Sequence, residues 1–108
     1  MQKLAIAAML ALLSAGPAFA NCYEDIGCTD DDKFRKSDLR ELSCELLYDV
    51  RNTIYKENGY CFKTEKAVDY FGNEGCWITN QSRVKLNSIE KFNVGQIVAV
   101  ENQLGCDE

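Results

Sequence analysis

The stretch that decides the fold is "SCELLYDVRNTIYKENG", residues 43–59. Ser43 is a good helix N-cap, because its hydroxyl can accept a hydrogen bond from a free backbone N–H of the first turn. Asn58-Gly59 is a good stop, because glycine adopts the left-handed conformation at little cost. The apolar residues between these signals recur at helical spacing and predict one buried stripe, formed by Leu46, Leu47, Val50 and Ile54.

Two further helices are predicted after this one. In residues 64–72, Thr64 is the expected cap and Gly72 the expected stop of a short helix, with Val68 and Phe71 on one face. A longer helix is expected from Asn87-Ser88 to Gly105, although its valine-rich run is also compatible with a short strand. Its expected stripe comprises Ile89, Phe92, Ile97, Val100 and Leu104.

The residues before the first long helix are less regular. Residues 21–36, "NCYEDIGCTDDDKFRK", show no sustained period and predict an ordered but irregular arm. Ser37 is a possible cap for a short turn. The run Asp30–Asp32 is read as a solvated acidic turn, because an EF-hand needs alternating ligands and a central glycine.

The first twenty residues have the three parts of a secretory signal peptide. Lys3 is the positive start, Leu4–Leu13 is an apolar run too short to span a bilayer, and cleavage is expected between Ala20 and Asn21. The sequence therefore predicts a signal peptide (1–20), an arm (21–36) and one folded domain (37–106). The domain is expected to be periplasmic or secreted, with no stable membrane insertion after cleavage.

The six cysteines all follow the predicted cleavage site and indicate a disulfide framework. They allow fifteen pairings. The helix layout favours joining the two ends of the short helix, Cys61–Cys76, and the outer ends of two antiparallel long helices, Cys44–Cys106, which leaves Cys22–Cys28. No cofactor and no metal are expected, because the chain has no histidine and no C-x-x-C pair.

The charge balance and the missing histidine narrow the function. All seventeen acidic residues lie after residue 20, with eleven of the twelve basic ones, so the expected mature chain has a net charge of −6. This argues against nucleic acid and anionic lipid as partners. Without histidine, Ser–His and Cys–His nucleophilic pairs are absent.

Residues 42–71 resemble the YARHG domain, a small bacterial extracytoplasmic domain. The matching positions keep the family's order and spacing: Leu42-Ser43, Arg51, Asn52, Ile54, Tyr55, Gly59, Tyr60, Phe62, Lys63, Tyr70 and Phe71, then Leu86, Glu90 and Asn93. The resemblance spans most of Leu39–Leu104 and leaves the arm outside. Where the family has Tyr-Ala-Arg-His-Gly, this chain has Tyr55-Lys56-Glu57-Asn58-Gly59, so no role of that arginine and histidine carries over. The resemblance implies a cell-envelope location and no particular activity.

The candidate binding residues are polar and aromatic. For Arg51 and Asn52 a structural role, with a carboxylate and a carbonyl as partners, is favoured over ligand binding. Tyr55 and Tyr60 are expected in an aromatic core, and Trp77 is the aromatic residue expected to be exposed. Glu45 with Asp49, and Asp69 with Tyr70, are candidate acid–base pairs, but three short helices are expected to leave little room for a cleft of ~300 Å³.

The sequence therefore predicts a mostly α-helical, disulfide-stabilised domain with two longer helices, one short helix and an irregular arm. Its expected function is a non-catalytic interaction module whose partner is a cell-wall component or an envelope protein. Two alternatives stay open: a small carboxylate-dependent hydrolase of a glycan, and a secreted effector or inhibitor acting on another protein. The oligomeric state is not predicted.

Overall fold

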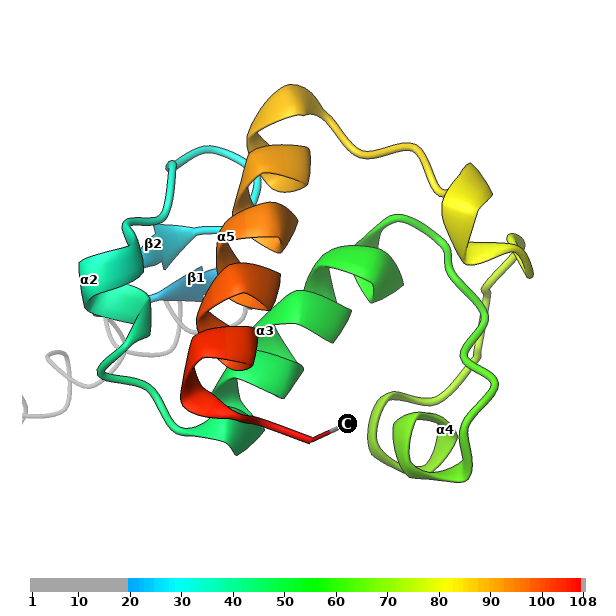
Figure 1. The fold of residues 1–108 in the computed structure, drawn as a ribbon. Helices are drawn as coiled ribbons and strands as arrows, with labels where there is room; N and C mark the ends of the chain where they lie inside the picture. The colour runs from blue at the N-terminus through cyan, green and yellow to red at the C-terminus, as the bar shows by residue number, and fades with distance from the viewer. Residues whose placement is uncertain (1–19, 108) are drawn as a thin grey trace, which may run out of the picture.

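The computed structural model describes residues 20–107 (Figure 1). The predicted signal peptide lies outside the described residues, except for Ala20 at the expected cleavage site. The elements, in order, are β1 (Cys22–Tyr23), β2 (Gly27–Cys28), α2 (Lys36–Leu39), α3 (Cys44–Glu57), α4 (Glu65–Phe71), the 3₁₀ helix η2 (Gln81–Arg83) and α5 (Ser88–Leu104). The fold is mostly α-helical, as the sequence predicts.

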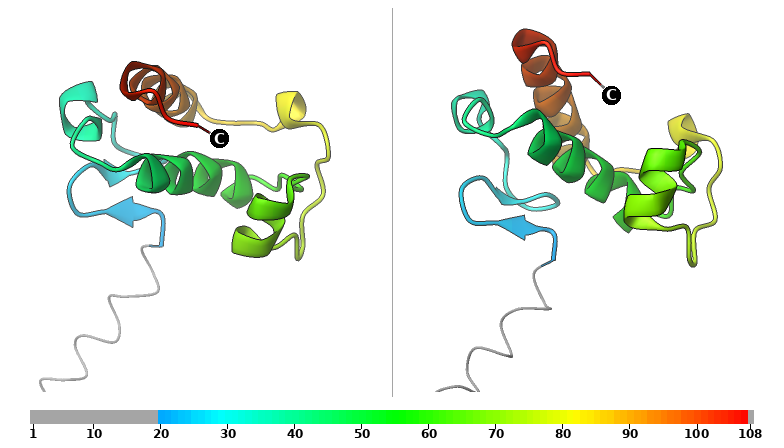
Figure 2. Two further views of the ribbon diagram at one scale, coloured as in Figure 1. Left: turned by 60° about the horizontal axis from the view of Figure 1, so that its bottom comes forward. Right: turned by 90° about the horizontal axis from the view of Figure 1, so that it is seen from below.

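Helices α3 and α5 are antiparallel neighbours. The Cys44–Cys106 disulfide joins the start of α3 to the end of α5. At the opposite ends, Asn58 Nδ2 donates to Glu90 Oε2 at 3.1 Å. Figures 1 and 2 show the β1–β2 hairpin and α2 on one side of this pair and α4 with η2 on the other.

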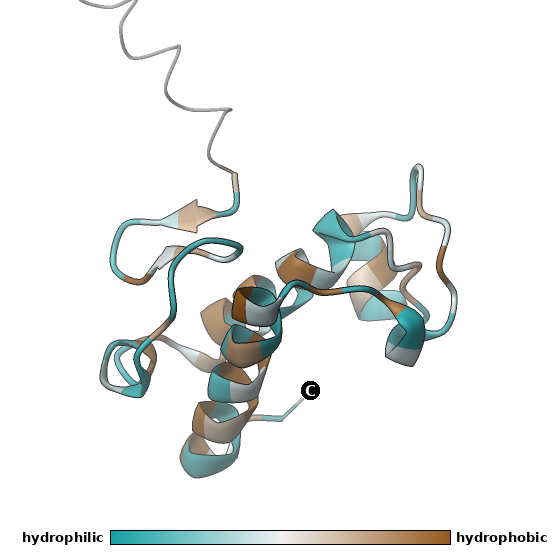
Figure 3. Cartoon of the chain, turned by 90° about the horizontal axis from the view of Figure 1, so that it is seen from above, coloured by the Kyte–Doolittle hydropathy of each residue, from teal (hydrophilic) through white to brown (hydrophobic). Residues whose placement is uncertain are grey.

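Two regions are useful for describing the site. The helical core comprises the arm, α2, α3 and α5. The lobe comprises residues 59–86, which include α4 and η2 and connect α3 to α5. The largest cluster of buried hydrophobic residues lies entirely in the helical core and comprises Ile26, Phe34, Leu39, Leu47, Val50, Ile54, Ile97 and Val100. Figure 3 shows hydrophobic colour where α3 and α5 cross and hydrophilic colour along the loop after β2.

The predicted helix ends are confirmed at both long helices. Ser43 Oγ accepts from Leu46 N at 3.1 Å at the start of α3. At the start of α5, Asn87 and Glu90 exchange side-chain and backbone hydrogen bonds in a capping box. Residues 97–100 are helical, so the alternative of a strand there is wrong.

Several local predictions need correction. Helix α2 begins at Lys36 with Arg35 at the N-cap, so Ser37 lies inside the first turn and is not the cap. On α5, Ile97 and Val100 of the expected stripe are buried, but Phe92 and Leu104 are exposed, and the buried face also contains Glu90, Asn93 and Glu101. The polar residues Asn93 and Glu101 on this face meet backbone groups of the arm and the Arg51 side chain.

The arm is more regular and more deeply packed than its sequence suggests. It forms a two-stranded antiparallel hairpin closed by Cys22–Cys28. The Phe34 side chain is fully buried in the core cluster. Asn93 on α5 fixes the arm, because its Oδ1 accepts from Phe34 N at 2.8 Å and its Nδ2 donates to the Thr29 and Asp32 carbonyls at 3.0 and 2.8 Å.

The lobe is held by a disulfide and by contacts with the end of α3. The Cys61–Cys76 disulfide spans α4, so all three disulfides join the cysteines that the helix layout paired. Residues 60 and 78 form a parallel bridge in which Cys61 N donates to Ile78 O at 2.8 Å. On α4, Ala67 is buried whereas Val68 is partly exposed, so the short helix packs through Ala67.

Candidate functional site

Arg51 and Asn52 are structural in their observed contacts. The Arg51 guanidinium forms a bidentate ion pair with Glu101, with distances of 2.8 and 3.1 Å, that ties α3 to α5. Asn52 Nδ2 donates to the Tyr48 carbonyl one turn earlier, at 2.9 Å. Both side chains are buried. They share a cavity of only about 140 Å³ with Tyr60, which is small for a ligand site, since such sites usually have ~300 Å³ or more.

Tyr55 and Tyr60 belong to a row of aromatic rings. Tyr60 N donates to the Tyr55 carbonyl at 3.1 Å, so the chain folds back after Gly59. Their rings are 5.9 Å apart in an edge-on arrangement, and Tyr60 meets Phe62 in the same way at 5.2 Å. Burial raises the pKa of Tyr55, partly offset by the positive charge of Arg51. The aromatic row therefore runs from Tyr55 at the end of α3 into the lobe, and Tyr55 and Tyr60 are half-buried in it.

Trp77 is the sequence-predicted candidate that lies at the surface. It is 70% exposed. Its backbone N–H and that of Ile78 both donate to the Gly59 carbonyl at 3.0 Å. The indole lies directly over Gly59, where an added Cβ would approach the ring carbons to 2.5 Å. Gly59 has φ +91°, which glycine adopts readily at the end of the helix. Its lack of a Cβ also leaves room for the Trp77 ring.

Two surface hollows adjoin Trp77. One, of about 450 Å³, is lined by Trp77, Ile78, Thr79, Asn80 and Arg83. The other, of about 410 Å³, is lined by Glu57, Asn58, Trp77, Ile78, Arg83 and Lys85. Trp77 and Arg83 line both, so an exposed ring and a cation stand side by side on the lobe.

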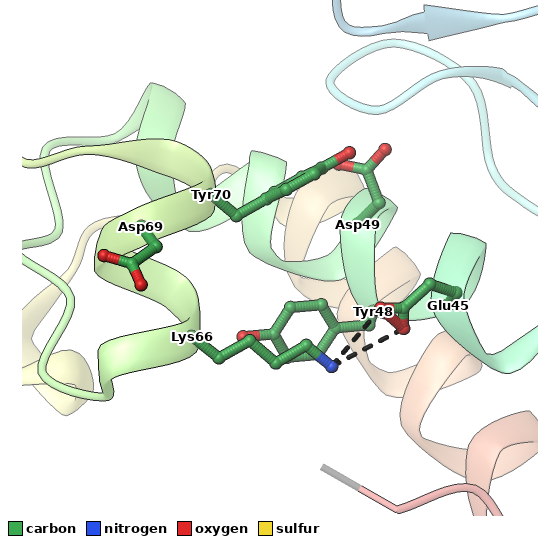
Figure 4. A pocket seen from close by; sticks show the side chains of 6 residues that line it. All are labelled: Glu45, Tyr48, Asp49, Lys66, Asp69 and Tyr70. Carbon is green, nitrogen blue, oxygen red and sulfur yellow. Dashed lines mark hydrogen bonds and ion pairs between the residues drawn. The ribbon is translucent and has the colours of Figure 1, made fainter.

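A third site lies between α3 and α4. It is a groove of about 410 Å³ lined by Glu45, Tyr48, Asp49, Lys66, Asp69 and Tyr70 (Figure 4). We call these six residues the α3–α4 groove. Its volume corrects the expectation that short helices leave little room for a cleft. The structure brings together both candidate acid–base pairs, Glu45 with Asp49 and Asp69 with Tyr70.

Lys66 reaches across this groove. Its Nζ lies 4.1 Å from the centre of the Tyr48 ring and 3.4 Å from Glu45 Oε2. Figure 4 shows the Lys66 side chain passing Tyr48 on its way from α4 to Glu45 on α3. An ammonium over the face of an aromatic ring is attracted by the ring quadrupole. The groove therefore holds an internal cation between an aromatic face and a carboxylate.

Asp49 and Tyr70 lie at the other side of the groove. In Figure 4 the phenol of Tyr70 points toward the Asp49 carboxylate. The negative charge of Asp49 raises the pKa of Tyr70, with smaller contributions from desolvation, the hydrogen bond to Asp49 and the charge of Glu45. Burial raises the pKa of Tyr23 on the arm, where Asp49 also contributes. Asp49 thus acts on tyrosines from both the arm and the lobe.

The described residues were searched for two further features, a cluster of metal ligands and a membrane-spanning helix. Within residues 20–107, no group of three or more histidine, cysteine or carboxylate side chains is placed to hold a metal ion. In the same part of the chain, no helix has the length and apolar character needed to cross a bilayer.

Sequence reasoning did not find the groove, although its signals are visible afterwards. Glu45 and Asp49 are four residues apart, as are Lys66 and Tyr70, so each pair shares a helix face. Helical spacing cannot show that the two faces meet. That information lies in the packing of α4 beside α3, where the Tyr48 and Phe71 ring centres are 6.3 Å apart.

These features define a small, disulfide-stabilised, mostly helical module with exposed aromatic and charged sites. The family model of the YARHG domain matches residues 23–102. The chain belongs to the YARHG domain family, whose members are extracytoplasmic, and three disulfides fit an oxidising compartment. The comparison with curated proteins gives no match, and the comparison with solved structures also gives none. The family match begins in the arm, which the residue-by-residue resemblance left outside.

Proposed function

We propose that this domain is a non-catalytic binding module of the cell envelope that holds a cell-wall saccharide on Trp77. The observation that carries the proposal is the placement of this side chain, 70% exposed and seated on Gly59. Indole is a large apolar surface, and leaving it in water forfeits the free energy that burial would give. A bound ligand would recover part of that free energy.

The Trp77 ring is held in place before any ligand arrives. The backbone on both sides of it is fixed by hydrogen bonds to Gly59, and its neighbour Cys76 is joined to Cys61. A ring held in this way loses little conformational entropy on binding. The C–H groups on one face of a pyranose ring suit the electron-rich face of an indole, because an aromatic ring is negative on its face.

Polar groups beside the ring suit the hydroxyls of a saccharide. Thr79, Asn80 and Arg83 line the same hollow as Trp77. Asn80 is oriented by Ser82, whose backbone N and hydroxyl donate to its Oδ1 at 3.0 and 2.7 Å. Saccharide recognition combines an apolar platform with a few placed donors and acceptors, and this surface supplies both.

The test uses the oxidised mature chain, residues 21–108, and purified sacculi. We expect the protein to sediment with sacculi and Trp77→Ala to abolish this. Tyr70→Ala is the matched control, because it removes another exposed aromatic outside the platform. Trp77 is the chain's single tryptophan, so its fluorescence should also respond to soluble N-acetylglucosamine oligomers.

Several results would overturn the proposal. The first is equal sedimentation of the Trp77→Ala and unmodified proteins. The second is binding only to an envelope protein and not to sacculi, which would favour the effector or inhibitor alternative. The third is turnover of the oligomers, which would favour a hydrolase. Because Trp77 is exposed, its replacement should leave the far-ultraviolet circular dichroism unchanged, and this shows that the variant is folded.

A further inference from the structure

The α3–α4 groove is a second site, separate from the Trp77 surface, and its chemistry suits a cation. Three of its six side chains are carboxylates and one is an ammonium, so the lining carries a net charge of −2. The Asp69 side chain has no hydrogen-bond or ion-pair partner within the described part of the chain. The groove therefore has more negative charge than its own lysine can balance.

The position of Lys66 shows what kind of group the groove accommodates. Its ammonium lies over the Tyr48 ring at 4.1 Å and beside Glu45 at 3.4 Å. The Lys66 side chain is 47% exposed, and that of Glu45 is 76% exposed. An ion pair this exposed contributes little to stability, roughly 0–1 kcal/mol. Lys66 can therefore leave the groove at small cost.

We propose that the α3–α4 groove binds a lysine or arginine side chain of a partner polypeptide, and that Lys66 occupies this position in the free domain. The incoming cation takes the place of the Lys66 ammonium over Tyr48, with Glu45 as its ion-pair partner. Asp49 and Asp69 add to the negative field of the groove, and the exposed Tyr70 ring contacts the methylene groups of the incoming side chain.

Charge complementarity argues for a basic segment as the occupant. The groove is acidic, and the expected mature chain has a net charge of −6 from seventeen acidic and eleven basic residues, so long-range attraction also favours a basic partner. A lysine or arginine side chain matches the groove in both features, because its charged end suits the carboxylates and its stem suits the two tyrosines.

The test measures the binding of two peptides by NMR chemical shifts of the amides of Glu45, Lys66, Asp69 and Tyr70. One is an acetylated, amidated glycine peptide with a central lysine, and the other has norleucine in its place. We expect the lysine peptide to shift these resonances and the norleucine peptide to leave them unmoved. Asp69→Asn should weaken binding about two- to fivefold, because it removes one exposed negative charge. Asp31→Asn, which removes an exposed acid outside the groove, should not.

Lys66→Met is the decisive variant. Because it removes the internal competitor, it should strengthen binding of the lysine peptide about two- to fivefold. Lys91→Met is its matched control, since it removes an exposed positive charge outside the groove and should have a smaller effect. The proposal is overturned if Lys66→Met weakens binding or acts no more strongly than Lys91→Met, or if both peptides shift the same resonances equally.

Discussion

The helical core and the lobe are stabilised by different kinds of contact. The core buries aliphatic side chains between antiparallel helices and satisfies its buried polar groups internally, as Asn93 and the Arg51–Glu101 pair show. The lobe buries little beyond Phe62 and Ala67 and depends on a row of aromatic rings and one disulfide. It leaves Tyr70 and Trp77 exposed.

The difference indicates where binding can evolve. The buried polar groups of the core already have partners inside the protein, so few of them are available to a ligand. The lobe, in contrast, exposes aromatic rings and charged side chains that a ligand can contact. Both proposed sites involve the lobe: the Trp77 surface belongs to it, and the α3–α4 groove lies where it meets α3. The two surfaces also differ in charge, since the Trp77 surface includes Arg83 and the groove is acidic.

Removing one disulfide at a time should lower the free energy of unfolding most, and the two losses compare the core with the lobe. Cys44–Cys106 closes a loop with a sequence separation of 62 residues, and Cys61–Cys76 closes one of 15. The chain-entropy model predicts losses of about 4 and about 3 kcal/mol in the free energy of unfolding. We expect Cys44→Ala/Cys106→Ala to be the more destabilising pair in urea titrations. A larger loss from Cys61→Ala/Cys76→Ala would show that the lobe carries more of the stability than its burial indicates.

The two ion pairs allow the stability of the core and of the groove to be compared at single residues. Glu101→Ala leaves the buried Arg51 guanidinium without its bidentate partner and should cost about 3 kcal/mol. Glu45→Ala removes the exposed partner of Lys66 and should cost no more than about 1 kcal/mol. Chemical unfolding of both variants gives the two values. Equal costs would contradict the assignment of the buried pair to the core and the exposed pair to the groove.

Gly59 joins the two regions, and its replacement tests how the lobe is attached. Gly59→Ala places a Cβ against the Trp77 ring at a residue with φ +91°, and we expect a loss of about 2 kcal/mol and a shifted Trp77 fluorescence maximum. Gly75→Ala is the control, because Gly75 also has a positive φ but has no atom within 4 Å of the added Cβ. Its loss should be smaller, with unchanged fluorescence. If the two losses are equal, the Trp77 contact does not matter.

Local signals predicted the helices well because helix ends are short-range features. Ser43, Asn87 and Gly105 are all found at the ends where the sequence places them. The exposure of Trp77 was also predicted, from its position between a half-cystine and polar residues.

The role of the arm could not be predicted, because it depends on distant contacts. Asn93 binds arm groups 59 to 64 residues away in the sequence, and such bonds leave no periodic pattern. Helical spacing alone therefore assigns Asn93 no role in anchoring the arm. The α3–α4 groove was missed for a related reason, since it depends on how α4 packs beside α3.

The smallest expected effect concerns Tyr70, where the lobe meets the core. Its pKa is raised above the ordinary tyrosine value of 10.0, mainly because phenolate would stand beside the Asp49 carboxylate. A raised pKa in the folded state means that the folded protein holds this proton more tightly than the unfolded chain does. The resulting stabilisation is fully present below pH 10 and is lost as the pH rises through the raised folded pKa.

Asp49→Asn should move the Tyr70 titration midpoint down toward 10, because it removes the first cause of the shift. The measurement is the ¹³C chemical shift of the tyrosine ring carbons across alkaline pH in the oxidised protein, which has no free cysteine among the described residues to reshuffle its disulfides. Asp69→Asn is the matched control, since Asp69 adjoins Tyr70 in the sequence but is not among the causes of the shift. Should Asp69→Asn lower the midpoint as much as Asp49→Asn, the phenol would be responding to the whole acidic groove. The position of the Tyr70 phenol against α3 would then not be fixed by Asp49.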